Sequence, residues 1–227
     1  MKKVVYSCLF SDGKRTLDIP CIKDTVRLNE WDYVMFTNVP DHLKDSGWVP
    51  IYKELIQDHP IYTAKHYKWL VHKYLLDYDI AIYVDAYLSP IVMDWNKYID
   101  KLKPDGIGNG IILMRHSRRN CIYDECSAIS NCRRDTKENM DNVITFLKEN
   151  NMPKKYGLSE GGLSIRHLKN NDFNSLCDEL FTLMLRFTYR DQALLSYVLW
   201  KNNTKVNCEL TKESYCISGK IGNHVYT

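Results

Sequence analysis

Hydrophobic and polar positions along the chain change rhythm several times, and these changes predict alternating strands and helices. Short apolar runs at 3–10, 32–37 and 79–84 are typical of strands buried in a sheet. Residues 61–76 instead repeat apolar positions with helical spacing, and Pro60 stands at their start, where its missing N–H costs nothing. A strand, a helix and a strand therefore follow one another in the first part of the chain.

The rest of the chain continues this alternation. It predicts further strands at 48–52, 111–114, 163–165 and 205–210, and further helices at 141–150, 174–187 and 191–200. Strands separated by helices favour βαβ units and a mainly parallel sheet. The chain has 227 residues, no internal repeat and no linker-like tract. We therefore expect one α/β domain over 1–227, with a mainly parallel central sheet flanked by helices.

The composition argues against several classes of protein. The net charge of +3 is too small to indicate a nucleic-acid partner, and the basic residues form no long run. No apolar stretch approaches the roughly 20 residues of a membrane span, and the N-terminus lacks a signal-peptide pattern. The eight cysteines include no Cys-x-x-Cys pair, and Cys121, Cys126 and Cys132 match no known zinc spacing. We expect a cytoplasmic protein with reduced thiols, from a virus or a bacterium.

The first candidate for function is Asp85, which ends the apolar run 80–84. In open α/β sheets, ligands bind beyond the carboxyl ends of the strands, and this aspartate is expected there. Its carboxylate must be paired or must bind a cation, because burying it alone is too costly. An ordinary cap of a helix or loop explains the residue equally well.

A basic helix face precedes this aspartate. Lys65, Lys68 and His72 fall at positions i, i+3 and i+7 of the predicted helix and so share one face. Lysines beside a strand-end aspartate could hold a diphosphate together with a divalent cation, which neutralises charge on the leaving group. The alternative is a solvated face with a packed histidine, and by itself this is the commoner case.

Two further carboxylates lie in polar segments. Glu160 precedes two glycines that let the backbone approach a ligand closely, so it could bind a hydroxyl group or act as a base. Asp191 stands at a predicted helix start, where it could cap the helix or accept a proton from an attacking hydroxyl. A plain turn and a purely structural cap are the alternatives. The polar segment 116–125 suits either a ligand pocket or a surface loop with local ion pairs.

Five sequence blocks, in order, resemble the plant mucilage-type and turgor-regulation-type glycosyltransferase-like family, of the GT-A class. The longest lies at 68–75 and 82–86 and is similar to the family's "K-x-L-P-H-x-L-F" and "I-W-I-D-G". The others lie at 34–38, at 116–125, at 157–160 with 166–167, and at 190–196. A compact viral rhamnosyltransferase domain of GT-A type is also similar in size.

The resemblance implies a glycosyltransferase that moves a hexose or deoxyhexose from a nucleotide diphosphate donor, a UDP-sugar, to a hydroxyl of a glycan acceptor. It also implies a Mn²⁺ or Mg²⁺ cofactor bound by Asp85. GT-A enzymes usually carry Asp-x-Asp, but Tyr87 stands at the third position here. In several GT-A families a histidine near the C-terminus completes the metal site, which makes His224 the second expected ligand.

Catalytic roles facing the sugar and acceptor are implied for Glu160 and Asp191. The donor-binding residues that the resemblance and the basic helix face together indicate are Phe10, Ser11, Thr37, Asn38, Lys65, Lys68, Asp85, Ala86 and Arg118.

Two other functions stay open. A nucleotidyltransferase would use a similar sheet, but it normally has a glycine-rich basic loop after the first strand, and 11–15 is only a faint version. A nucleotide-sugar-binding module without transfer activity would be consistent with Tyr87 in place of the second aspartate. A glycosyltransferase would release nucleoside diphosphate, a nucleotidyltransferase would release pyrophosphate, and a binding module would release neither.

Overall fold

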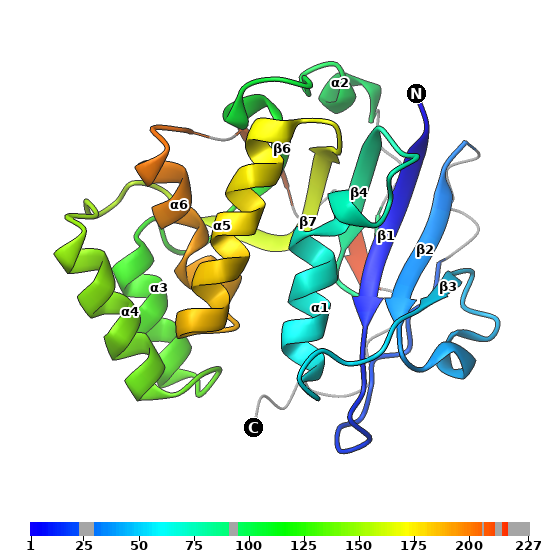
Figure 1. The fold of residues 1–227 in the computed structure, drawn as a ribbon, viewed down its shortest axis with the longest axis horizontal. Helices are drawn as coiled ribbons and strands as arrows, with labels where there is room; N and C mark the ends of the chain where they lie inside the picture. Colours follow the sequence, from blue (N-terminus) through cyan, green and yellow to red (C-terminus); the bar gives the residue numbers. More distant parts are fainter. Residues whose placement is uncertain (23–29, 91–94, 206, 212–214, 218–227) are drawn as a thin grey trace.

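A computed structural model of the chain describes residues 1–22, 30–90, 95–205, 207–211 and 215–217 (Figure 1). At its centre is a seven-stranded sheet with the order β3-β2-β1-β4-β7-β6-β8. Strand β7 is antiparallel to its neighbours β4 and β6, and the other six strands run parallel to one another. The expected α/β fold with a mainly parallel sheet is therefore confirmed.

The strands of this sheet are β1 (Lys3–Leu9), β2 (Asp32–Thr37), β3 (Val49–Tyr52), β4 (Ile80–Val84), β6 (Ile111–Arg115), β7 (Ser159–His167) and β8 (Asn207–Leu210). A separate antiparallel pair joins β5 (Leu88–Pro90) and β9 (Tyr215–Ile217).

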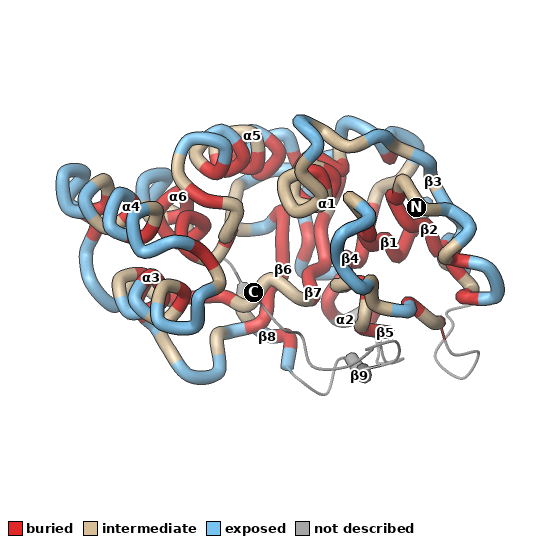
Figure 2. The backbone as a smooth tube through the Cα atoms, turned by 90° about the horizontal axis from the view of Figure 1, so that it is seen from below, coloured by how far each residue is buried: buried red, intermediate tan, exposed pale blue. Residues whose placement is uncertain are grey.

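Helices cover both faces of the sheet. In the two views, α1 and α5 lie on one face, α2 lies on the other, and α3, α4 and α6 gather beside β6 (Figures 1 and 2). The helices are α1 (Pro60–Trp69), α2 (Asn96–Ile99), α3 (Ile122–Asn131), α4 (Lys137–Glu149), α5 (Asn171–Phe187) and α6 (Leu195–Lys201). Short 3-10 turns are η2 (Pro40–Leu43), η3 (Val71–Lys73), η4 (Ile107–Asn109) and η5 (Asp191–Ala193).

The central strands are apolar on both faces because both faces are covered. Along β1, Tyr6 packs with Val71 on the side of α1, whereas its neighbour Val5 packs with Tyr98 of α2. Successive side chains of a strand point to opposite faces, so a strand covered on both sides is mostly apolar. This packing explains the continuous apolar runs and the red tube at the middle of Figure 2.

The helix expected at 61–76 is shorter in the structure. It begins at Pro60, with the His59 side chain accepting the N–H of Tyr62 at 3.3 Å, and it ends at Trp69 before the turn η3. The buried guanidinium of Arg166 donates to the last carbonyls of this helix. Those hydrogen bonds satisfy carbonyl groups that a continuing helix would have paired, and they end α1 there.

Three other expectations differ from the structure. The strand expected at 163–165 extends over the whole of β7, because the glycine pair 161–162 lies inside the strand and does not form a turn. Helix α3 was not expected. The helix expected at 191–200 begins as the 3-10 turn η5 and continues as α6.

Within the described part of the chain, no helix combines the length and the apolar character needed to cross a bilayer.

Candidate active site

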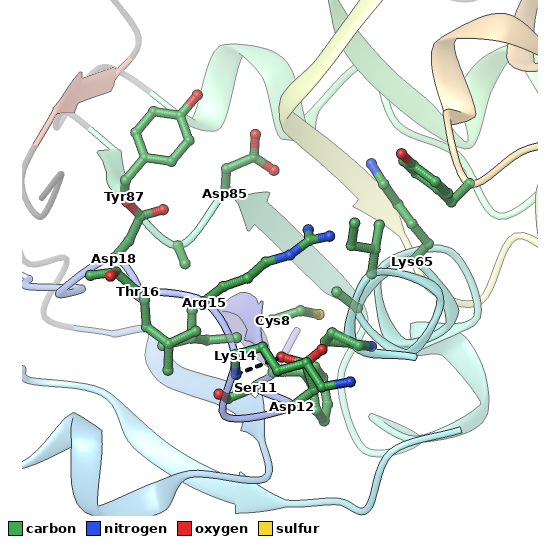
Figure 3. A pocket seen from close by; sticks show the side chains of 18 of the residues that line it. Cys8, Ser11, Asp12, Lys14, Arg15, Thr16, Asp18, Lys65, Asp85 and Tyr87 are labelled. Atoms are coloured by element: carbon green, nitrogen blue, oxygen red, sulfur yellow. Dashed lines mark hydrogen bonds between the residues drawn. The ribbon is translucent and has the colours of Figure 1, made fainter. Parts of the chain in front are cut away.

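A cleft of about 570 Å³ opens where β1 and β4 end (Figure 3). Its wall is formed by the loop after β1, the first turns of α1 and the segment after β4. Arg133, Arg134, Tyr189 and Arg190, which are distant in sequence, complete it. This is the edge of an open α/β sheet at which ligands bind.

Asp85 lines this cleft, as expected from its place after β4. Its backbone N–H donates to the carbonyl of Gly162 at 2.9 Å, and its Oδ1 accepts the hydroxyl of Tyr83 at 2.9 Å. Burial raises the pKa of Tyr83 well above its usual value, so this hydroxyl stays protonated and keeps donating. A Cβ on Gly162 would lie 3.2 Å from Asp85 Oδ2, so the glycine leaves room beside the carboxylate.

The donor set of the cleft fits a divalent cation only together with a ligand that brings its own oxygens. Within the described residues, no three His, Cys, Asp or Glu side chains are grouped as metal ligands. Mg²⁺ is commonly bound through one or two carboxylates plus substrate phosphates, and Asp85 supplies one carboxylate. His224, the expected second ligand, lies outside the described residues.

Lys65, Lys68 and Asp191 form what we call the lysine cluster. Asp191 Oδ2 lies 2.9 Å from Lys65 Nζ and 2.6 Å from Lys68 Nζ, and it accepts the indole N–H of Trp69 at 3.0 Å. The other oxygen, Oδ1, accepts the backbone N–H of Gln192 at 3.1 Å. Lys65 lines the cleft, whereas Lys68 and Asp191, with side chains 4% and 7% exposed, do not.

The two ammonium groups dominate the electrostatics of this cluster. Burial alone would raise the pKa of Asp191, but Lys65 and Lys68 hold it well below its usual range. Burial lowers the pKa of Lys65 to about 8, although the charge of Asp191 acts in the opposite direction. Asp191 is therefore a stable carboxylate, and its role as a proton acceptor stays a prediction.

The buried Arg166 fixes the helix that carries both lysines. Its Nη1 donates to the carbonyls of Lys68 and Trp69 at 3.2 and 3.0 Å. The hydroxyl of Tyr6 on β1 also donates to the Lys68 carbonyl, at 2.8 Å. No sequence pattern indicates this role for Arg166, because these partners are backbone carbonyls of a helix far away in the chain.

Three further predicted donor-binding residues, Phe10, Ser11 and Ala86, line the cleft. Asn38 does not line it but holds the loop: the Ser11 N–H donates to its Oδ1 at 2.9 Å, and its Nδ2 donates to the Ser11 carbonyl at 2.7 Å. Thr37 is fully buried, and its hydroxyl accepts the N–H of Val39. These two residues support the cleft wall from behind.

Glu160 and Arg118 belong to a different group. Glu160 Oε1 accepts the backbone N–H and the hydroxyl of Ser117, both at 2.9 Å, and the exposed Arg118 follows in the same loop. Neither Glu160 nor Arg118 lines the cleft. Their roles in catalysis and donor binding stay predictions.

The loop itself is fixed by His116, Arg119 and Glu125, which we call the histidine cluster. Arg119 Nε donates to Glu125 Oε2 at 2.5 Å, and His116 Nε2 lies 3.4 Å from the same oxygen. His116 Nδ1 accepts two backbone N–H groups of the loop.

Sequence reasoning missed part of the cleft wall. Figure 3 shows Arg15, from the loop after β1, pointing into the space between Asp85 and Lys65. Arg133 and Arg134, between α3 and α4, also line the cleft. In the sequence, the pairs of basic residues at 14–15 and 133–134 were the only signal for this part of the cleft wall. They show no periodic pattern that would have placed them at the cleft.

The chain was compared with known proteins at the level of family and of fold. A family model described as TOD1/MUCI70, glycosyltransferase-like domain, matches residues 4–226. No curated protein matches. Among solved structures, mouse xyloside xylosyltransferase 1 in its apo form is 10% identical, with a TM-score of 0.51, and the match covers 90% of this chain and 84% of that one.

Two longer proteins also match over most of this chain. GlyE, a glycosyltransferase of Streptococcus pneumoniae, is 13% identical, with a TM-score of 0.44, over 90% of this chain and 44% of that one. The bifunctional glycosyltransferase WbbM in its apo form is 10% identical, with a TM-score of 0.46, over 87% of this chain and 37% of that one. At 10% identity, the similarity to the mouse enzyme shows the fold alone. No conclusion is drawn from the two structures with TM-scores below 0.5.

Proposed function

The chain belongs to the TOD1/MUCI70 glycosyltransferase-like family, and we propose that it transfers a sugar from a nucleotide diphosphate donor to a hydroxyl of a glycan acceptor. The donor we propose is a UDP-sugar, and the unit transferred is a hexose or deoxyhexose. One observation carries the proposal: Asp85, after β4, and Lys65, on α1, line the same cleft. A leaving diphosphate is stabilised by a cation that a carboxylate can hold and by an ammonium group that binds phosphate oxygen.

In this proposal the donor lies along the end of β1. Phe10 and Ser11 border the base and ribose, and Asn38 keeps that loop in place through its two hydrogen bonds. Lys65 binds the diphosphate, and Asp85 would hold a divalent cation. The hydroxyl of Tyr83 orients the Asp85 carboxylate.

A Mn²⁺ or Mg²⁺ ion bound at Asp85 would neutralise the negative charge that develops on the leaving diphosphate. His224 is the proposed second protein ligand. Glu160 is proposed to reach the acceptor from the start of β7, and its bond to Ser117 would have to open for that role.

We also propose that the protein works in a reducing compartment such as the cytoplasm. Seven cysteines of the described chain are free thiols, which supports this location.

The test is the product released from a panel of nucleotide sugars. We expect release of UDP that requires the protein and increases when a glycan acceptor is supplied. Release of pyrophosphate would instead indicate a nucleotidyltransferase. Binding of UDP without release from any donor would indicate a binding module, the alternative that Tyr87 favours.

A further inference from the structure

We infer that Asp191 is a positioning residue: its carboxylate holds the ammonium group of Lys65 at the cleft, and Lys65 contacts the donor phosphates. This inference rests on the proposed function and specifies how the donor site is built. It replaces the proton-accepting role expected for Asp191, since the carboxylate would act on the donor only through Lys65.

The hydrogen bonds of Asp191 support positioning over proton transfer. Oδ2 receives Lys65, Lys68 and the indole of Trp69, and Oδ1 receives a backbone N–H. A carboxylate has about four lone-pair sites in all, so these contacts use most of its capacity. A general base needs an oxygen within reach of the attacking hydroxyl, but this carboxylate does not line the cleft.

The exposure of the two lysines shows which one meets a ligand. The Lys65 side chain is 18% exposed and lines the cleft, whereas Lys68 is 4% exposed. The backbone of β7 lies close to Lys68 on its other side, since a Cβ on Gly161 would lie only 2.7 Å from its Nζ. Lys68 therefore fixes Asp191, and Asp191 fixes Lys65.

The charges of the cluster do not balance. Two ammonium groups share one carboxylate, so one positive charge is left over at a buried site. Asp85 and Arg190 also act on Lys65, Arg15 points into the space between Asp85 and Lys65 (Figure 3), and the Lys65 charge acts in turn on Cys8. A diphosphate bound beside Lys65 would supply the missing negative charge, and it would favour the ammonium form of that lysine.

This arrangement predicts a specific dependence of donor binding on pH. Burial lowers the pKa of Lys65 to about 8, and Asp191 keeps it from falling further. Only the ammonium form binds phosphate well, so affinity for UDP should fall as the pH rises through about 8. Asp191→Asn removes the opposing charge, which should move this fall to lower pH.

The experiment is calorimetric titration of UDP between about pH 6.5 and about pH 9.5, for the wild type, Asp191→Asn and Lys65→Met. We expect Lys65→Met to weaken binding by about 10–100-fold near neutral pH and to remove the step near pH 8. Asp191→Asn should bind weakly at alkaline pH and recover toward the wild type at the acidic end. Asp178→Asn, which alters an exposed pair with Lys73, is the matched control and should follow the wild type.

A second readout uses the wild type alone, in case Asp191→Asn folds poorly. Titrations near pH 8 in two buffers of different ionisation enthalpy should reveal net proton uptake on UDP binding. The terminal phosphate of UDP is already ionised there, because its second pKa is about 6. The uptake should disappear in Lys65→Met.

Each outcome decides the matter. If Asp191→Asn keeps the wild-type affinity and pH profile while sugar transfer is lost, Asp191 is a general base and the inference is wrong. Absence of proton uptake in the wild type would also overturn it. Failure of the wild type to bind UDP at any pH would overturn the proposed function itself, which is a different and recognisable result.

Discussion

The lysine cluster and the histidine cluster both adjoin the first residues of β7, and they use charge in different ways. The lysine cluster contains two ammonium groups for one carboxylate, and one of them opens to the cleft. In the histidine cluster, Arg119 and Glu125 neutralise each other, and burial lowers the pKa of His116 and favours its neutral form. The unpaired positive charge of the lysine cluster, buried beside the cleft, favours binding of an anionic ligand. The balanced charges of the histidine cluster hold a loop in place.

The largest effect should come from removing the carboxylate opposite the lysine cluster. Asp85→Ala should reduce sugar transfer by about 10²–10³-fold, because it removes the carboxylate that would hold the cation, and the cation would neutralise the leaving diphosphate. The melting temperature should stay close to that of the wild type. Asp79→Ala is the matched control, since Asp79 precedes β4 at its other end and accepts the N–H of Lys2. A loss of transfer in the control as large as in Asp85→Ala would contradict this account.

The next effect concerns the open ammonium group of the lysine cluster. Lys65→Met should weaken UDP binding by about 10–100-fold, which is the value of one charge-assisted hydrogen bond. Lys73→Met, four residues beyond α1 and paired with Asp178 at the surface, should leave the affinity unchanged. Equal affinities for the two variants, measured by calorimetry, would show that Lys65 does not meet the donor.

The histidine cluster should respond in stability and not in donor binding. Glu125→Gln removes the negative charge that pairs with Arg119 at a site only 1% exposed, so the free energy of unfolding should fall by about 1–3 kcal/mol. For a domain of this size, each kcal/mol lowers the melting temperature by about 2–4 °C. If Glu125→Gln weakened UDP binding as strongly as Lys65→Met, the contrast between the clusters would fail.

The smallest effect is expected at Arg118, in the loop that the histidine cluster holds. Its side chain is exposed and does not line the cleft, so Arg118→Ala should change both stability and UDP affinity by less than about 0.5 kcal/mol. A large loss of affinity would restore the donor-binding role that the resemblance implied for it. Thermal melts and UDP titrations measure both quantities on the same sample.

The part of the site near β4 could be predicted because it depends on local sequence. The run 80–84 is apolar at every position, so it predicted a buried strand, and Asp85 had to lie at its carboxyl end. Lys65 and Lys68 are three residues apart, which places them on one helix face whatever the fold. The resemblance then supplied the family, which the family match over residues 4–226 confirms.

The rest depends on contacts between residues far apart in the chain. Asp191 accepts a hydrogen bond from Lys68, which lies 123 positions away in the chain. Arg166 donates to the end of α1, which lies 97 or more positions away. Propensity patterns do not report such contacts. For the glycine pair 161–162 the sequence left close approach to a ligand and a plain turn as alternatives, because the approach of these glycines to Lys68 and Asp85 exists only in the folded chain.

We propose that the cleft between Asp85 and Lys65 binds a nucleoside diphosphate with the help of a divalent cation. The decisive measurement is calorimetric titration of UDP into the wild type, first with Mn²⁺ and then with a chelator. We expect binding to be tighter with Mn²⁺, and this difference to be lost in Asp85→Ala. Equal affinity with Mn²⁺ and with chelator, or no binding of UDP under either condition, would contradict it.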